Sequence, residues 1–426
     1  MKVLIVSAIE SKGGAARAAH RLYDGLLGHG VDVTYLTNFR SSTNSEIISL
    51  WPYFTNVVAL FFTLLDKLPL LLYPQRQRTI FSPAVVPTQI NSLINTIGPD
   101  IVHLHWIAHG SISIEQIAKI RKPILWTLHD SWAFTGGCHL PFDCKRYQSA
   151  CGSCPQLGSS YSGDLSNRIW KRKEKAFKEL NIQVVAPSQW LAGCARLSSL
   201  FKDFDVTVIP NGIDTKLYQP TDISLARAKL NLPQNKKLVL FGAMGLSKDA
   251  NKGLQFLKPV LKNLAKQKIE DLEFVIMGSR KSGRDLDFGF PIHYLGTVRS
   301  EPAIVSLYGA VDVTLLLSLQ ENLPFVVMES LSCGTPVVAF KIGGVPDMVD
   351  HQVNGYLAKP YEVEDIARGI AWVLEDKARQ VRLREQARKK CEDHFSLELQ
   401  ARRYTKLYSQ ILSKQQLSAK ESILGQ

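Results

Sequence analysis

The stretch MKVLIVSAIESKGGAARAAHRLYDGLL, residues 1–27, contains an apolar run, then a glycine pair, then a helical pattern. The run Val3-Leu4-Ile5-Val6 is typical of a buried parallel strand, because such a strand is covered on both faces. Gly13 and Gly14 allow a close backbone turn, and the apolar spacing up to Leu27 indicates a helix. This strand, turn and helix together form the unit from which doubly wound α/β sheets are built.

The same alternation of apolar runs and helical patterns occupies two halves of the chain. With 426 residues, two domains of roughly 200 residues each are expected. Turn-forming residues over 208–214, including Pro210 and Asn211-Gly212, separate the halves. We therefore predict an α/β fold with domains at 1–205 and 206–395, and a helical segment at 396–426 that crosses back to the first domain. The expected strands are 3–6, 33–36, 101–104, 124–128 and 184–186, then 238–241, 273–277, 313–317 and 336–340.

Composition and charge limit the classes of partner. Hydrophobic residues make up 45% and charged residues 21% of the chain, as in ordinary globular proteins. Lys and Arg outnumber Asp and Glu by 51 to 38, and the net charge of +13 favours anionic partners such as sugar nucleotides, lipid diphosphates or acidic lipid. No zinc-finger helix or RNA-binding aromatic pattern is found, so we expect no nucleic-acid partner. The first residues lack the features of a secretion signal, and we expect a cytoplasmic protein.

One segment, residues 51–73, is strongly apolar. Its continuous part, 57–65, ends at Asp66 and Lys67 and is shorter than the ~20 residues that a spanning helix needs. Two interpretations remain open, a buried helix of the first domain or a shallow dip into a membrane surface. In the second interpretation, the residues near the lipid headgroups would be Trp51, Tyr53 and Tyr73.

In each half of the chain, glycine precedes an expected helix at a corresponding place. The backbone after Gly13-Gly14 would present free amides and the positive end of a helix dipole, which suit a diphosphate. In the second half, Lys248 and Lys252 precede Gly253 at the start of a helix, where a lysine could neutralise the charge on a departing phosphate. The alternatives are an ordinary strand-to-helix turn and lysines solvated at the surface.

Two glutamates lie eight positions apart in the stretch 320–336. Glu321 follows an expected strand, and Glu329 falls inside an apolar helix, where an unpaired carboxylate would be costly. Hydroxyl groups of a ribose or hexose would satisfy Glu329, and so would a Lys or Arg partner. After the next strand, Gly343-Gly344 forms another glycine turn whose amides could face the same pocket.

Four of the seven cysteines cluster as Cys-x5-Cys-x6-Cys-x2-Cys. A reducing cytoplasm disfavours disulfides, and the final pair has the spacing of a tetrahedral zinc clasp. A structural zinc ion and four free thiols both remain open, and a zinc ion here would stiffen the protein rather than perform chemistry. The cysteines are Cys138, Cys144, Cys151 and Cys154.

Taken in order, these motifs resemble the retaining glycosyltransferases of family 4. That resemblance implies the GT-B architecture, an α/β fold with two Rossmann-like domains facing each other across a cleft. Residues 126–132 and the run Glu321-Asn322-Leu323-Pro324 are similar to the exopolysaccharide branch typified by colanic acid biosynthesis enzymes. The motifs that carry the resemblance are 13–17, His129-Asp130, 210–213, Lys252-Gly253 and Glu321 with Glu329.

The resemblance also implies roles for individual residues. Glu329 would hold the donor ribose and Glu321 the hydroxyls of the transferred sugar, while Lys252 and the amides of Gly13 and Gly14 would hold the diphosphate. His129 would contact the sugar from the first domain, which would bind the acceptor. His129, Lys252 and Glu321 would thus be the catalytic residues.

Further donor-binding residues follow from the same resemblance. The family usually has an arginine about six residues before its lysine, where this chain has Leu246, so the second positive charge would come from Lys248, Arg280 or another residue. The nucleobase would bind near the loop 294–298. The further donor-binding candidates are Arg17, Lys248, Leu295, Asn322 and Leu323.

The implied function is transfer of a hexosyl group from a UDP- or GDP-sugar, with retention, to a glycan or lipid-linked oligosaccharide in polysaccharide biosynthesis. No cofactor would be required for catalysis, a structural zinc would be optional, and the protein would contact the inner membrane surface peripherally. One alternative is a sugar-nucleotide epimerase on the same fold. Another is a non-catalytic sugar-nucleotide-binding partner subunit, against which the intact Lys252, Glu321 and Glu329 argue.

Overall fold

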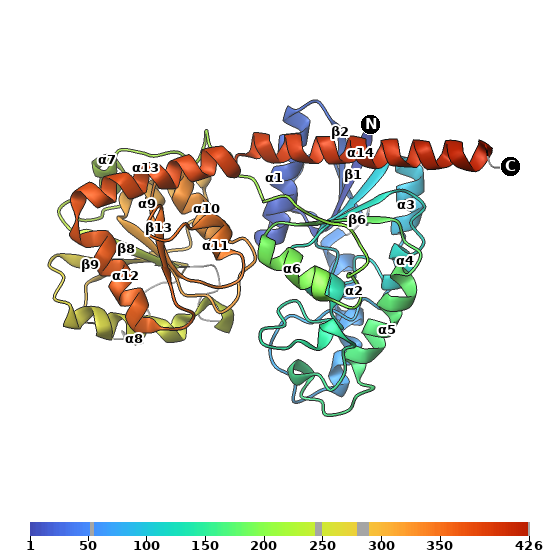
Figure 1. The fold of residues 1–426 in the computed structure, drawn as a ribbon, viewed down its shortest axis with the longest axis horizontal. Helices are drawn as coiled ribbons and strands as arrows, with labels where there is room; N and C mark the ends of the chain where they lie inside the picture. Colours follow the sequence, from blue (N-terminus) through green and yellow to red (C-terminus); the bar gives the residue numbers. More distant parts are fainter. Residues whose placement is uncertain (52–54, 243–248, 279–288, 425–426) are drawn as a thin grey trace. The chain divides into compact units, whose positions relative to one another are not determined.

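A computed structural model describes residues 1–51, 55–242, 249–278 and 289–424, and Figure 1 shows its fold. The chain divides into two compact units. The first unit comprises Met1–Gly212 and Glu398–Gln426, and the second comprises Ile213–Leu397. Each unit is an α/β domain built on its own parallel sheet.

The described part of the first unit forms a parallel sheet with the order β3-β2-β1-β4-β5-β6-β7. The order reverses between β1 and β4, which are hydrogen-bonded neighbours. Its strands are β1 (Lys2–Ile9), β2 (Asp32–Phe39), β3 (Ile47–Ser49), β4 (Ile101–Leu104), β5 (Ile124–Thr127), β6 (Ile182–Ala186) and β7 (Val206–Val208). Its α-helices are α1 (Gly14–Gly28), α2 (Thr55–Lys67), α3 (Ile90–Ile97), α4 (Ile114–Ile117), α5 (Leu165–Phe177), α6 (Gln189–Leu197) and α14 (Leu397–Leu424). Single 3-10 turns are η1 (Leu68–Leu72), η2 (Trp132–Phe134), η3 (Arg146–Gln148) and η4 (Pro155–Leu157).

Two hydrophobic cores cover the faces of the first sheet, because alternate residues of each strand point to opposite sides. One face packs against α3, α5 and α6. The other face packs against α1 and the C-terminal helix α14, drawn in red in Figure 1. Four fully buried polar groups also join α14 to the strands: His103 contacts Tyr408 and Thr127, each at 2.7 Å, and Thr127 contacts Tyr404 at 2.8 Å.

The described part of the second unit has a parallel sheet in the order β10-β9-β8-β11-β12-β13, which reverses between β8 and β11. Its strands are β8 (Lys237–Gly242), β9 (Leu272–Met277), β10 (Ile292–Gly296), β11 (Val313–Leu316), β12 (Val337–Phe340) and β13 (Gly355–Ala358). Its helices are α7 (Ile223–Lys229), η5 (Ala250–Lys252), α8 (Leu254–Lys266), α9 (Glu301–Ala310), α10 (Phe325–Ser332), α11 (Val345–Met348), α12 (Val363–Glu375) and α13 (Lys377–His394).

The structure corrects two of the expected boundaries. Residues 206–212 belong to the first unit rather than the second, because β7 pairs with β6 and completes the first sheet. Residues 396–397 belong to the second unit, because Ser396 bridges to Ile213 and Leu397 donates a backbone hydrogen bond to Ile213. The crossover helix therefore enters the first unit at Glu398.

For the apolar segment 51–73, the structure decides against one of the two interpretations that the sequence left open. The segment contains a helix, α2, as expected, but that helix is not a buried one, since Val57, Leu60, Phe61 and Leu64 are exposed. Within the ranges that the structure describes, no helix combines the length and apolar character that a bilayer-spanning segment needs. Of the residues expected near headgroups, Tyr53 lies outside the described part of the chain.

Candidate functional site

The candidate residues lie at the carboxyl edges of the two sheets. In open parallel sheets, ligands bind beyond this edge, at the point where the strand order reverses. In the second unit that point lies between β8 and β11, whose following loops carry Lys252 and Glu321. In the first unit it lies between β1 and β4, and the loops after β1, β4 and β5 carry Gly13, His105 and His129.

Lys252 and Glu321 form an ion pair in the second unit. The Nζ atom of Lys252 lies 2.7 Å from Oε1 of Glu321, and Ser318 donates its hydroxyl to the same oxygen at 2.8 Å. The two side chains remain 27% and 14% exposed, so both reach solvent. A cation and a carboxylate side by side can hold a phosphate oxygen and a sugar hydroxyl respectively.

The backbone around this pair is fixed by two glycines with positive φ. Gly253 has φ of 72°, and a Cβ there would lie 1.8 Å from the carbonyl oxygen of Leu317. Gly343 has φ of 49°, and a Cβ there would lie 1.9 Å from the carbonyl oxygen of Glu321. The Gly344 amide donates to that same Glu321 carbonyl at 3.0 Å, so this glycine turn holds the Glu321 loop instead of offering that amide to a ligand.

Glu329 lies about one turn into α10 and is only 3% exposed. The buried hydroxyl of Tyr308, on α9, donates to its Oε2 at 3.3 Å. From the sequence, a buried Glu329 was expected to have a sugar hydroxyl or a cation as its polar partner. In the structure Tyr308 is one such partner.

The helix α1 begins at Gly14, directly after β1. Gly13 precedes it with φ of 94°, no side chain of the described residues caps the helix, and space is open around both glycines. Arg17 lies in the first turn of the helix and is half-buried. An uncapped helix start with free space suits an anion. Lys248, Leu246 and Arg280 fall outside the described residues.

The remaining donor-binding candidates lie at the same edge of the second sheet. Asn322 is half-buried in the loop after β11, and Leu323 is buried in the core. Leu295 lies within β10, an edge strand, and not in the loop that the sequence suggested. The loop begins after Gly296, whose carbonyl accepts from the Gly278 amide at 2.7 Å.

In the first unit, His129 pairs with a second histidine. Its Nε2 lies 2.9 Å from Nδ1 of His105, and the two rings stack with centroids 5.2 Å apart. Burial lowers the pKa of His129 to about 4, although the charge of Asp130 acts in the opposite direction. Burial also holds the pKa of His105 well below its usual range. At neutral pH both imidazoles are therefore uncharged hydrogen-bonding groups.

Asp130, beside His129, has partners of its own. Burial alone would raise its pKa, but the charge and hydrogen bond of His139, with hydrogen bonds from the Trp132 amide and the Trp106 indole, hold the pKa below its usual range. Its Oδ2 lies 2.6 Å from His139 Nδ1 and accepts from Trp106 Nε1 at 2.7 Å. Asp130 is thus an ionised group that orients the loop after β5.

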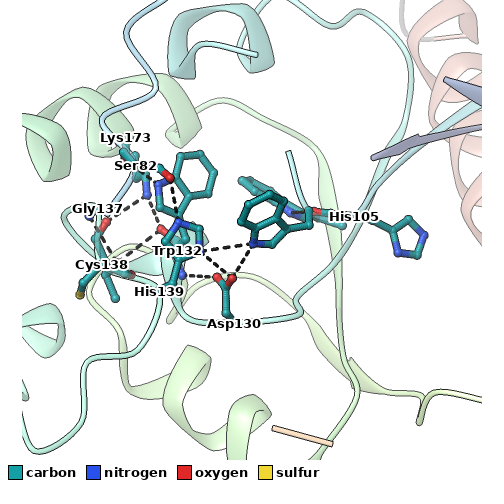
Figure 2. Close-up of polar contacts among 11 residues, drawn as sticks. Ser82, His105, Asp130, Trp132, Gly137, Cys138, His139 and Lys173 are labelled. Carbon is teal, nitrogen blue, oxygen red and sulfur yellow. Dashed lines mark hydrogen bonds and ion pairs between the residues drawn. The ribbon is translucent and has the colours of Figure 1, made fainter. Parts of the chain in front are cut away.

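Figure 2 shows these contacts continuing from Asp130 through His139 and Trp132 to Lys173. Lys173 is fully buried, donates to the carbonyls of Trp132 and Thr135, and lies 3.8 Å from the ring centroid of Trp132. Burial lowers its pKa to about 7, against the raising effect of Cys151, Cys138 and Asp130. This buried network holds in place the loop after β5, which carries His129 and Asp130.

The four cysteines of the loop after β5 all lie within the described part of the chain. Among the described residues, no three His, Cys, Asp or Glu side chains are grouped so that they could hold a metal ion. Cys138, Cys144, Cys151 and Cys154 are free thiols, and the Gly136 amide donates to the sulfur of Cys151 at 3.1 Å. Burial raises the pKa of Cys151 to about 12. A zinc ion at these cysteines stays a prediction, which metal analysis of the purified protein would test.

Three residues near His129 and Asp130 were not predicted from the sequence, namely His105, Trp106 and His139. We call these five residues the histidine cluster. His105 and Trp106 directly follow β4, and a strand of apolar residues followed by His and Trp at the carboxyl edge is a signal that could have found them. His139 lies nine positions after Asp130, and only the folded loop brings the two side chains together.

Two family models match the chain. One, described as glycosyl transferases group 1, matches residues 222–390, and the other, described as glycosyltransferase family 4, matches residues 12–217. The matches follow the division of the chain into its second and first units.

Individual relatives and solved structures share a low sequence identity with this chain. A protein of Escherichia coli provisionally named colanic acid biosynthesis glycosyl transferase WcaC is 26% identical over 267 residues, 58% of this chain, and the match spans only 61% of that relative. Among solved structures, sucrose-phosphate synthase from Thermosynechococcus elongatus aligns with a TM-score of 0.70 and 18% identity over 97% of this chain and all of that one. HepE of Anabaena, solved with UDP-glucose, aligns with a TM-score of 0.64 and 18% identity over 96% of this chain and all of that one.

Proposed function

Because the chain belongs to the glycosyltransferases of the group 1 and family 4 type, with the GT-B fold, we propose that it transfers a hexosyl group from a UDP- or GDP-sugar with retention. The acceptor in this proposal is a glycan or a lipid-linked oligosaccharide of a surface or secreted polysaccharide. The name of WcaC, from colanic acid biosynthesis, supports the choice of a polysaccharide acceptor, and HepE, which was solved with UDP-glucose, supports the choice of a sugar-nucleotide donor.

The observation that carries the proposal is the Lys252–Glu321 pair at the carboxyl edge of the second sheet. In our proposal Lys252 binds a phosphate oxygen of the donor and Glu321 accepts hydrogen bonds from hydroxyls of the transferred sugar. Lys252 then stabilises the negative charge that grows on the diphosphate as it leaves, an effect commonly worth several kcal/mol. Glu329 would accept from the hydroxyls of the donor ribose.

In this proposal the first unit binds the acceptor and also contacts the donor. The amides at the start of α1 would bind the diphosphate, and the uncharged imidazole of His129 would accept or donate a hydrogen bond to the sugar. A neutral imidazole suits a sugar hydroxyl, because it can stabilise the hydroxyl without adding a charge beside the reacting carbon.

The proposed step breaks the bond between the anomeric carbon and the donor phosphate oxygen, and forms a bond to the acceptor oxygen on the same face. The acceptor proton passes to the departing phosphate oxygen, so no protein base is needed. Charge on the diphosphate is met by Lys252 and backbone amides, and we propose that no metal ion is required for transfer. Undiminished turnover in the presence of EDTA is the expected result.

Location follows from the chemistry of the substrates. We propose that transfer takes place in the cytoplasm, where a lipid-linked acceptor would hold the enzyme at the inner face of a membrane. We propose this peripheral location for the protein.

The test is a transfer assay with UDP- and GDP-hexoses and a lipid-linked oligosaccharide acceptor, read out by nucleotide release and by product NMR. Lys252→Met and Glu321→Gln should each lower kcat at least about a hundredfold, whereas Lys258→Met, an exposed lysine on α8, should leave it unchanged. The anomeric configuration of the product should match that of the donor. Inverted configuration would refute retention, and sugar isomerisation without an acceptor would favour an epimerase.

A further inference from the structure

The helix α2 and the turn η1 have their apolar side chains on the outside. Outward positions at helical spacing carry large hydrophobic residues that are between 52% and 77% exposed. Soluble proteins rarely leave such a contiguous row of side chains in water, because each would be stabilised by burial. We call this surface the apolar ridge, formed by Val57, Leu60, Phe61, Leu64, Leu71 and Leu72.

The inward face of α2 carries two polar side chains beside the buried Ala59. Thr63 is buried and directs its hydroxyl to the carbonyls of Ala59 and His109 at 2.8 and 2.9 Å. Asp66 is also buried and accepts from the backbone amides of Val85 and Ala84 at 2.7 and 3.3 Å. These contacts fix the rotation of α2, so the apolar ridge cannot turn inward without leaving a carboxylate unpaired.

Positive charge borders the ridge. Lys67 lies on α2 itself, and Arg76 and Arg78 follow η1 within a few residues; all three are exposed. The one acidic residue between positions 55 and 80 is Asp66, which faces inward. An apolar strip bordered only by cations matches the acyl region and the anionic headgroups of a phospholipid surface.

The segment after β4 contacts α2 and also carries residues of the histidine cluster. A Cβ on Gly110 would lie 2.7 Å from the carbonyl of Phe62, so α2 packs directly on the segment after β4. In that segment the ring of His109 lies 4.6 Å from the ring of Trp106, and Trp106 donates to Asp130. A surface that contacts lipid would therefore lie beside the proposed acceptor site.

From these observations we infer that the apolar ridge docks the protein on a bilayer rich in anionic phospholipid, lying in the interface without crossing it. This inference rests on the peripheral location proposed above and names the surface that makes the contact, while docking itself requires neither donor nor acceptor. A second copy of the chain is a poorer occupant, because a two-fold contact through the ridge would bring the same three cations close to their own copies. Trp51 and Tyr73 are not the anchors, because Trp51 donates to Asn38 and the Tyr73 hydroxyl accepts from the Leu165 amide.

The test is co-sedimentation of the full chain with two kinds of vesicle, without any sugar nucleotide. One kind contains phosphatidylcholine alone, and the other contains equal parts of phosphatidylcholine and phosphatidylglycerol. Tight binding to the anionic vesicles is expected. The triple variant Phe61→Ser, Leu64→Ser, Leu71→Ser should bind roughly a hundredfold more weakly, and Arg76→Gln with Arg78→Gln roughly twentyfold more weakly on anionic vesicles alone.

The matched control is Leu225→Ser, a leucine of α7 that is 65% exposed and should leave vesicle binding unchanged. Glu321→Gln should also bind vesicles normally, which separates docking from transfer. A second readout keeps the ridge apolar: brominated lipid should quench a larger share of the fluorescence in Leu64→Trp than in wild type, which has seven tryptophans, and Leu225→Trp should show no such increase. Equal vesicle binding by wild type and the triple variant would overturn the inference, as would a wild-type dimer that the triple variant dissociates.

Discussion

At Gly253 both the backbone and the surrounding space exclude any other residue. Its φ is 72°, and a Cβ would overlap the carbonyl oxygen of Leu317 at 1.8 Å. Replacing glycine at positive φ costs about 1–2 kcal/mol for the conformation alone, and relief of the clash adds to it. We therefore expect Gly253→Ala to lower the free energy of unfolding by more than about 2 kcal/mol, measured by urea denaturation.

The control for this prediction is Gly14→Ala. Gly14 lies in helical conformation at the start of α1, and no atom lies within 4 Å of the added Cβ. Its substitution should change stability by less than about 1 kcal/mol. Similar losses in the two variants would contradict the assignment of Gly253 as a position that requires glycine.

Lys173 makes a pH-dependent contribution to stability. Burial lowers its pKa to about 7 in the folded protein, whereas an unfolded lysine titrates near 10.4. Between these values the unfolded chain holds one more proton, so the contribution of Lys173 to the free energy of unfolding rises with pH from about 7 to about 10. In Lys173→Met this rise, up to a few kcal/mol, should disappear.

The measurement is thermal or urea unfolding across that pH range, compared between variants. Lys171→Met, which removes an exposed lysine of the same helix, is the control and should follow wild type. Subtracting the curves removes the contributions of buried cysteines and tyrosines, which also titrate in this range. If Lys173→Met keeps the wild-type slope, the buried amine is not the source of the pH dependence.

The helix α14 is held against the first sheet by its apolar face and by the buried hydrogen bonds of Tyr404 and Tyr408. The Tyr408 hydroxyl is the partner of His103 Nδ1, at 2.7 Å and fully buried. Tyr408→Phe leaves that nitrogen without its partner, which should cost about 1–3 kcal/mol of stability. Denaturant unfolding followed by circular dichroism measures the change.

Two neighbouring substitutions calibrate this loss. Tyr404→Phe should cost less, because Thr127 keeps its contact with His103 at 2.7 Å. Ser409→Ala should be nearly neutral, because Ser409 is exposed and contacts only the backbone of its own helix. Equal stability of Tyr408→Phe and Ser409→Ala would mean that the hydroxyl is dispensable for holding α14.

For the whole molecule, ligand binding and folding are linked. A sugar nucleotide that binds only the folded protein should stabilise it by about 2.7 kcal/mol at a hundred times its Kd. The unfolding temperature should then rise by several degrees for the correct nucleotide sugar, and less for other bases or sugars. A thermal-shift screen over UDP- and GDP-hexoses therefore identifies the donor.

Variants show where that stabilisation originates. It should be lost in Glu321→Gln and Lys252→Met, and retained in Lys258→Met. Stabilisation that survives in all three variants would mean that the nucleotide sugar binds away from the Lys252–Glu321 pair.

The central strands were predictable because each is a continuous apolar run. β1, β4, β5, β8, β11 and β12 are buried on both faces, and their runs fall at the expected positions. The edge strand β13 (Gly355–Ala358) was missed although three of its four residues are buried, because so short a run beginning with glycine gives little local signal. The short edge strands β3, β7 and β10 were missed because β3 and β7 each bury one of three residues and β10 buries one of five. Such half-exposed strands have no apolar run to detect.

The sequence by itself determined the α/β class, the two halves and the order of motifs, because these depend on local periodicity and on residue type. Only the tertiary structure decided which side chains meet: Lys252 and Glu321 are separated by 69 positions, and His103 and Tyr408 by 305. The apolar segment 55–72 shows the same limit, since its composition predicted a helix and left open whether its apolar face points inward or outward. That orientation depends on where the polar side of α2 finds its partners, and those partners lie on loops distant in sequence.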